Sequence, residues 1–269
     1  HSIIAEKLGA TLYQCSRSAL RTVELRYFLD GVYNDMDTEY VWGKQFLGDD
    51  LTLEINEDLD VMAYLKEMEA KGKVKSSVKK ADLITLNIGC NDVFSYPMVL
   101  ALNQLSTKIP ELSATSALLR KTGNIGSALG GLIEASNSLL TGTIVAATLV
   151  ENINSAVELY KQNFTAILKD IYKLNPDVTV VIVGMYNPLK NAQLKSNSVM
   201  KLDALAASTV NKVNTFLSGL TSQYSDLYYV GTADTEVYQI NMDDSNAVNL
   251  FLLKAHPTLA GHQYIADQI

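Results

Sequence analysis

Several residue types that mark specialised proteins are scarce in this sequence. Its 269 residues include two cysteines, Cys15 and Cys90, which are too few for a disulfide framework in a chain of this size. Lysine and arginine total 22 against 29 acidic residues, and the formal net charge is −7. Because binding to a phosphate backbone needs an excess of Lys and Arg, this balance works against a nucleic-acid partner.

Motifs for nucleotides, metals and membranes are also absent. The sequence has no Walker-type loop, no Gly-x-Gly-x-x-Gly fingerprint and no zinc-spaced set of Cys and His. Its N-terminus lacks the charged segment and apolar core of a signal peptide. Residues 125–150 carry a single charge, Glu134, but four glycines and several Ser, Asn and Thr interrupt them. Packed helices are therefore favoured over a membrane span, and we expect no transmembrane segment.

What is present is an ordinary globular composition, with 48% hydrophobic and 19% charged residues. That balance supplies enough apolar material for one substantial core. Since α/β domains often exceed 200 residues, we expect one domain over residues 1–269 that carries an insertion.

Predicted helices and strands alternate through most of the chain. Buried parallel strands read as continuous apolar runs, and Leu83–Ile88 is such a run. Further strands are predicted at Val178–Gly184 and Leu227–Gly231, and a short one at Thr11–Cys15. Helical spacing or capping predicts helices over Ser2–Leu8, Thr22–Leu29, Asp60–Lys71, about Thr148–Leu174, about Met200–Leu220, and from near Thr258 to the last residue. The pattern predicts an α/β fold, a three-layer αβα sandwich with a parallel, flavodoxin-like sheet. Sites in such sheets lie at the carboxyl ends of the strands, here after Cys15, Ile88, Val183 and Val230.

Residues 95–150 break this alternation. They are rich in Leu, Ala, Ser, Thr and Gly and contain few aromatic residues. We interpret them as an inserted helical pair that could serve as a lid over the site.

The most informative segment is Gly89-Cys90-Asn91-Asp92, directly after a predicted strand. A carboxamide at the carboxyl end of a strand can donate a hydrogen bond to a developing oxyanion. Asp92 is placed to cap the helix that follows. The alternative is that Asn91 and Asp92 only shape a strand-to-helix turn.

Histidine is represented by His1, His256 and His262 alone. His256 lies in a loop before the last predicted helix, where a general base can be held at the edge of a sheet. The terminal His1 and the helical His262 are interpreted as structural.

At these two places the sequence resembles the SGNH (GDSL-type) hydrolase family. Gly89 to Asp92 match the third block of that family, Gly-x-Asn-Asp, and Ala255 to Ala266 resemble its fifth block, in which the catalytic histidine precedes a Pro. The resemblance implies that Gly89 and Asn91 belong to the catalytic site, with Asn91 as oxyanion donor, and that His256 is the base. The second block should supply a glycine whose N–H also faces the oxyanion, and segment 16–22 has Ala19 at that position.

Two features depart from the family pattern. No Gly-Asp-Ser occurs anywhere in the sequence, so the nucleophilic serine of the first block is expected upstream of His1, in a domain truncated at its N-terminus. The family places an aspartate three residues before the catalytic histidine, where this chain has Leu253. Asp243, Asp244 or a backbone carbonyl could orient the ring instead, because the acid mainly fixes the histidine tautomer.

The resemblance implies a serine ester hydrolase that works through an acyl-enzyme without metal or organic cofactor. Expected substrates are short-chain esters, acetylated sugars or lipid esters, and the family favours a secreted or cell-surface location. The alternative is a catalytically inactive binding module on the same scaffold. Leu253 in the acid position supports that alternative, whereas Asn91 and His256 argue against it.

Overall fold

The structure is a computed structural model that describes residues 2–47, 55–123, 125–136, 139–190, 192–193, 202–238, 240–241 and 256–269. At its centre is a parallel sheet of three strands, β1 (Leu83–Leu86), β2 (Thr179–Val183) and β4 (Leu227–Val230), in the order β1-β2-β4. Ile84 of β1 is in register with Val180 of β2, which is in register with Leu227 of β4. A short parallel pair joins β3 (Ala192–Gln193) to β5 (Ile240–Asn241).

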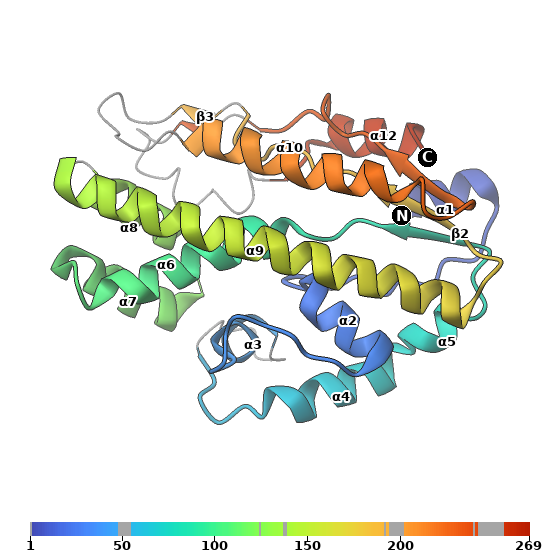
Figure 1. Cartoon of the computed structure of the whole chain (residues 1–269), viewed down its shortest axis with the longest axis horizontal. Coiled ribbons are helices and arrows are strands. Elements are labelled where there is room, and N and C mark those ends of the chain that lie inside the picture. The colour runs from blue at the N-terminus through green and yellow to red at the C-terminus, as the bar shows by residue number, and fades with distance from the viewer. Residues whose placement is uncertain are drawn as a thin grey trace.

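Helices cover both faces of this sheet. In Figure 1 the strands lie between α10 and α12 above and α9 and α2 below. The helices described are α1 (Ser2–Leu8), α2 (Thr22–Asp30), α3 (Val41–Phe46), α4 (Val61–Gly72), α5 (Val74–Val78), α6 (Tyr96–Ser106), α7 (Pro110–Thr122), α8 (Ile125–Ala135), α9 (Leu139–Leu174), α10 (Leu202–Leu220) and α12 (Leu259–Asp267). The predicted α/β class is confirmed.

The core lies along β2 and α9. Every residue of β2 after Thr179 is buried, which explains the unbroken run of β-branched residues. Tyr160, Phe164 and Leu168 of α9 are buried at helical spacing, and α9 packs against α2. The helix predicted to start near Thr148 starts at Leu139. Its first turns have no charged residues, so they resemble the apolar segment before them and the helix start could not be recognised from the sequence.

Residues 95–150 contain more helix than the predicted pair. They comprise α6, α7, α8 and the first turns of α9, which gather at one end of the molecule in Figure 1. Leu102, Leu112 and Leu132, one from each of the first three helices, are fully buried and pack these helices together. None of the helices described in the chain has the length and apolar character needed to cross a bilayer.

The predicted strand Thr11–Cys15 is wrong. These residues are extended but exposed, and within the described ranges they pair with no strand. A sequence of strand-forming residues becomes a strand only when a neighbouring strand satisfies its backbone groups. A cavity separates this segment from β1. The last helix also ends at Asp267, two residues before the expected end.

Candidate functional site

The residues that follow β1 and those that precede α2 meet at the carboxyl edge of the sheet. Nδ2 of Asn91 donates a hydrogen bond to the backbone carbonyl oxygen of Leu20 over 3.1 Å. A carboxamide has two N–H donors, so this bond fixes the side chain and leaves the second donor available. Asn91 also begins a single π-helical turn, η1 (Asn91–Ser95), and such turns are frequent at functional sites.

Ala19 has the backbone conformation of a glycine. Its φ of 63° lies in the left-handed region, which residues with a Cβ seldom adopt. The indole Nε1 of the buried Trp42 donates to the carbonyl oxygen of Ala19 over 3.0 Å and helps to hold this conformation. Ala19, the predicted second donor, therefore has a glycine-like backbone.

Asp92 connects the two segments, and its predicted role is corrected. Its carboxylate does not cap the helix that follows it. It accepts hydrogen bonds from the backbone N–H of Thr22 over 3.0 and 3.1 Å and from the hydroxyl of Thr22. Because Thr22 is the first residue of α2, Asp92 caps that helix from another part of the chain. Burial raises the pKa of Asp92 to about 7, and the bonds from Thr22 oppose this shift.

Gly89 is required by close packing. Its φ is 132°, and a Cβ at this position would lie 2.5 Å from Cε2 of Tyr160 and 3.0 Å from Cε of Met185. The hydroxyl of Tyr160 also donates to the carbonyl oxygen of Ile88 over 3.3 Å. Helix α9 therefore packs directly against the backbone two residues before Asn91.

The sequence did not indicate the buried cluster around Arg21. The guanidinium of Arg21 forms ion pairs with Glu24 over 2.7 Å and with Asp35 over 2.6 Å, and it lies over the rings of Trp42 and Tyr96. The two carboxylates raise the pKa of Arg21 against the opposing effect of burial, so it stays charged. Glu24 is the third residue of α2 and accepts a hydrogen bond from the backbone N–H of Arg21 over 2.8 Å. A glutamate at this position of a helix is the sequence signal that could have indicated the contact with Arg21.

His256 is exposed and lies immediately before a fixed turn. Pro257 forms a bridge with Val237, and the N–H of Thr258 donates to the carbonyl oxygen of Glu236 over 3.0 Å. The hydroxyl of Thr258 accepts from the N–H of Gly261 over 3.1 Å and caps α12. His256, the predicted base, is thereby attached to the segment that follows β4.

The other candidate residues fall in several places. Asp243, Asp244 and Leu253 lie outside the described residues, as does His1. His262 lies within α12, and its backbone N–H donates to the carbonyl oxygen of Thr258. Burial raises the pKa of the Cys90 thiol to about 12, which keeps it protonated and argues against a cysteine nucleophile.

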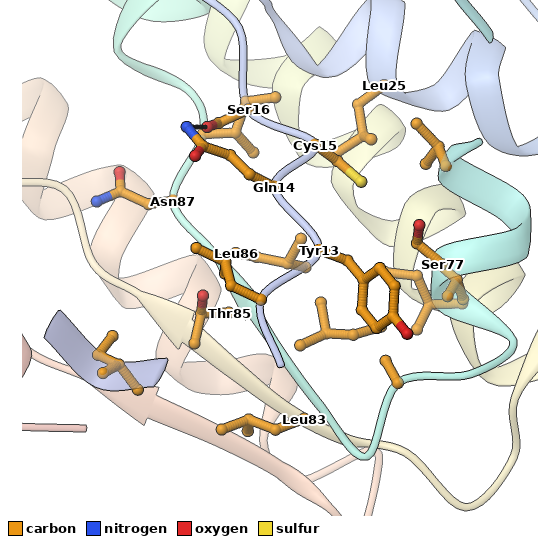
Figure 2. A pocket seen from close by; sticks show the side chains of 18 of the residues that line it. Tyr13, Gln14, Cys15, Ser16, Leu25, Ser77, Leu83, Thr85, Leu86 and Asn87 are labelled. Atoms are coloured by element: carbon orange, nitrogen blue, oxygen red, sulfur yellow. Dashed lines mark hydrogen bonds between the residues drawn. The ribbon is translucent and has the colours of Figure 1, made fainter. Parts of the chain in front are cut away.

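A cavity of about 630 Å³ opens beside these residues. Residues 11–17 line one side of it, and β1 with the residues up to Asn91 lines the other. Figure 2 shows the two segments running in the same direction, with Tyr13 and Cys15 on one and Leu83 and Asn87 on the other. The carboxyl end of each segment leads to Ala19 or to Asn91.

A parallel sheet with helices on both faces and polar groups gathered at its carboxyl edge defines an α/β protein. The chain belongs to the GDSL-like lipase/acylhydrolase family, whose model matches residues 38–269. The match includes Gly89, Asn91 and His256, whereas Ala19 lies before it. No curated protein matches the chain.

Proposed function

We propose that the protein is a serine ester hydrolase in which Asn91 and the N–H of Ala19 stabilise an oxyanion. The observation that carries this proposal is the joint placement of the two donors. Asn91 is anchored to the carbonyl of Leu20, the residue next to Ala19, and Ala19 has a left-handed backbone. Donors fixed before the reaction cost no reorganisation when charge develops.

In the proposed mechanism a serine upstream of His1 attacks the ester carbonyl carbon, and His256 accepts the hydroxyl proton. The oxyanion of the tetrahedral intermediate accepts hydrogen bonds from Asn91, from Ala19 and from the N–H of the serine itself. The intermediate collapses, His256 protonates the departing alcohol, and an acyl-enzyme remains. His256 takes a proton from water, which attacks the acyl carbon, and then returns that proton to the serine oxygen as the acid is released.

The proposed substrates are short-chain esters, acetylated sugars or lipid esters. Family membership supports an acyl ester, and the mechanism above uses neither a metal nor an organic cofactor. Asp243 or Asp244 would orient His256, since Leu253 cannot accept a hydrogen bond. Changing the responsible aspartate to Asn would lower turnover by orders of magnitude, and full activity in the double variant would assign the orienting role to a backbone carbonyl.

Ester hydrolysis by the polypeptide that includes the residues encoded before His1 tests the proposal. Wild type should hydrolyse an activated acetyl ester, and His256→Ala should lose most of this activity because the variant lacks the proposed acceptor of the serine proton. His262→Ala is the matched control, since His262 lies one turn into α12 and has no proposed role. Equal activity of wild type and a folded His256→Ala variant would contradict the mechanism.

A binding module is the second candidate, and Leu253 in the acid position favours it. Such a module would bind an acylated ligand without hydrolysing it. Calorimetric binding of an acetylated sugar by a folded wild-type protein that shows no ester turnover would establish this second function.

A further inference from the structure

Arg21 contacts two aromatic rings that come from different parts of the chain. Its guanidinium carbon lies 5.3 Å from the ring centroid of Trp42 and 4.5 Å from that of Tyr96. The two rings also meet each other edge to face, with their centroids 6.0 Å apart. Because a planar guanidinium stacks on an aromatic face in few orientations, these contacts fix the three side chains relative to one another.

Trp42 and Tyr96 each bond to the backbone of one proposed oxyanion donor. The indole N–H of Trp42 donates to the carbonyl oxygen of Ala19. The backbone N–H of Tyr96 donates to the carbonyl oxygen of Asn91. Asn91 in turn donates from its side chain to the carbonyl oxygen of Leu20. A shift of the guanidinium would therefore reach both donors, one through each ring.

Two buried carboxylates hold the guanidinium in place. Glu24 and Asp35 form ion pairs with it over 2.7 and 2.6 Å, and none of the three side chains is more than 2% exposed. The two oxygens of Asp35 accept from both terminal nitrogens of Arg21, over 3.2 and 2.6 Å. This fork of two bonds needs the plane of an arginine, and the ammonium of a lysine cannot reproduce it.

Neither stability nor charge accounts for this buried cluster. Moving three charged groups out of water costs free energy that their mutual attraction repays only in part. Nε of Arg21 is also buried without a hydrogen bond in the part of the chain that the structure describes, which adds to the cost. The positive charge does not act on an oxyanion directly, since two carboxylates outnumber it. What the cluster supplies is a fixed geometry.

From these contacts we propose that Arg21 is a positioning residue that sets the distance between the carboxamide of Asn91 and the N–H of Ala19. It acts through Tyr96 and Trp42 and touches neither the substrate nor the reacting atoms. Oxyanion donors act mainly in the transition state, so a change in their spacing lowers kcat and leaves KM nearly unchanged. The effect on turnover rests on the proposed function, whereas the placement of the donors can be tested without turnover.

Arg21→Lys, in the polypeptide that includes the residues encoded before His1, separates geometry from charge. Lysine keeps the positive charge but loses the planar fork and the stacking. We expect kcat for an activated acetyl ester to fall about 10- to 100-fold and KM to stay within about twofold of wild type, because the donors are displaced rather than removed. Arg26→Lys is the matched control and should keep wild-type kcat. Arg26 lies in α2, the helix that follows Arg21, pairs with Asp30 over 3.1 Å and has no proposed role.

Trp42→Phe tests the connection to Ala19 and leaves the ion pairs intact. It keeps an aromatic ring beside the guanidinium and removes the indole N–H, so kcat should fall about tenfold with little change in KM. If Arg21→Lys does not fold, this variant decides. Leu112→Ala removes apolar packing far from the donors in the sequence and should leave the kcat of the folded protein unchanged. Full activity in Arg21→Lys or in Trp42→Phe would overturn the inference, as would an equal loss in Leu112→Ala.

Hydrogen exchange at two side chains separates this inference from the proposed function. The indole N–H of Trp42 and the carboxamide N–H of Asn91 report on the two donor segments. Both should exchange at least about fivefold faster in Arg21→Lys than in Arg26→Lys. Such a difference in a protein whose wild type shows no ester turnover would contradict the proposed function and support the placement of the donors by Arg21. Equal rates in the two variants would overturn the inference even in an active esterase.

Discussion

Ala19 shows how a residue with a Cβ can be held in a backbone conformation that usually requires glycine. What an oxyanion site needs at this position is a backbone N–H in a particular direction, and that direction follows from φ and ψ. Ala19 retains a φ of 63° with the help of the bond from Trp42 to its carbonyl. The left-handed conformation costs a residue with a Cβ on the order of 1 kcal/mol, which the surrounding contacts must offset.

Replacing Ala19 with Gly should therefore leave stability unchanged or raise it by up to about 1 kcal/mol, since relief of backbone strain competes with greater freedom of the unfolded chain. Ala19→Val is the matched variant and should destabilise by roughly 1–3 kcal/mol, because a β-branched side chain tolerates this conformation poorly. Urea unfolding measures both. If the Gly variant were less stable than the Val variant, position 19 would not need a left-handed backbone.

Asp92 gives a prediction for pH. Its folded-state pKa is raised to about 7 from 3.8, so between these values the folded protein binds more protons than the unfolded one. Its contribution to stability must then decrease as the pH rises from about 4 to about 7. The free energy of unfolding of wild type relative to Asp92→Asn, which does not titrate, should fall over this range. A difference that rises with pH would mean that the bonds from Thr22 outweigh burial.

Among the helices and strands, the sequence predicted those whose formation depends on the local pattern of apolar residues. The runs that became β1, β2 and β4 are apolar and β-rich, and the main helices follow apolar residues at helical spacing. Thr11–Cys15 has the same strand-forming character but is unpaired in the described chain, because pairing depends on a neighbour that local sequence does not report. Asp92 was assigned to the wrong helix for the same reason, since Thr22 is 70 positions away.

The helices of residues 95–150 form a packed unit, and α7 offers a direct comparison. Leu112 is fully buried, whereas Leu118 on the same helix is 47% exposed. Leu112→Ala should reduce the free energy of unfolding by about 2–5 kcal/mol through loss of apolar contacts and the cavity that remains. Leu118→Ala should change it by no more than about 0.5 kcal/mol. Similar effects in the two variants would show that α7 does not pack on α6 and α8 in solution.

The proposed role of these helices as a lid leads to a different measurement. Leu140 and Ile144 in the first turns of α9 are 74% and 41% exposed, which leaves apolar surface for a long acyl group. The double change to Ser should reduce hydrolysis of dodecanoyl esters more than that of acetyl esters, because an acetyl group is too short to use this surface. Acetyl esters are the internal control. Equal losses on both would leave the helices with a structural role only.

For the molecule as a whole, the sequence identified the α/β class and the family, because two motifs stand at the expected ends of predicted strands and helices. The roles of Asn91 and His256 stay predictions. It could not reveal the bonds that assemble the site. Trp42, Arg21 and Tyr160 position Ala19 and Gly89 through contacts between distant segments, and no local pattern encodes such contacts. The cavity beside β1 likewise arises only when the elements are assembled.

Covalent labelling with a fluorophosphonate, followed by peptide mapping, tests the central claim most directly. This reagent is attacked by an activated serine and mimics the tetrahedral intermediate, so its reaction needs both nucleophile and oxyanion donors. In the polypeptide that includes the residues encoded before His1, we predict one adduct, on a serine upstream of His1, and labelling roughly 10²- to 10³-fold slower in Asn91→Ala. Absence of an adduct, or an adduct within residues 1–269 that forms equally fast in Asn91→Ala, would contradict the account.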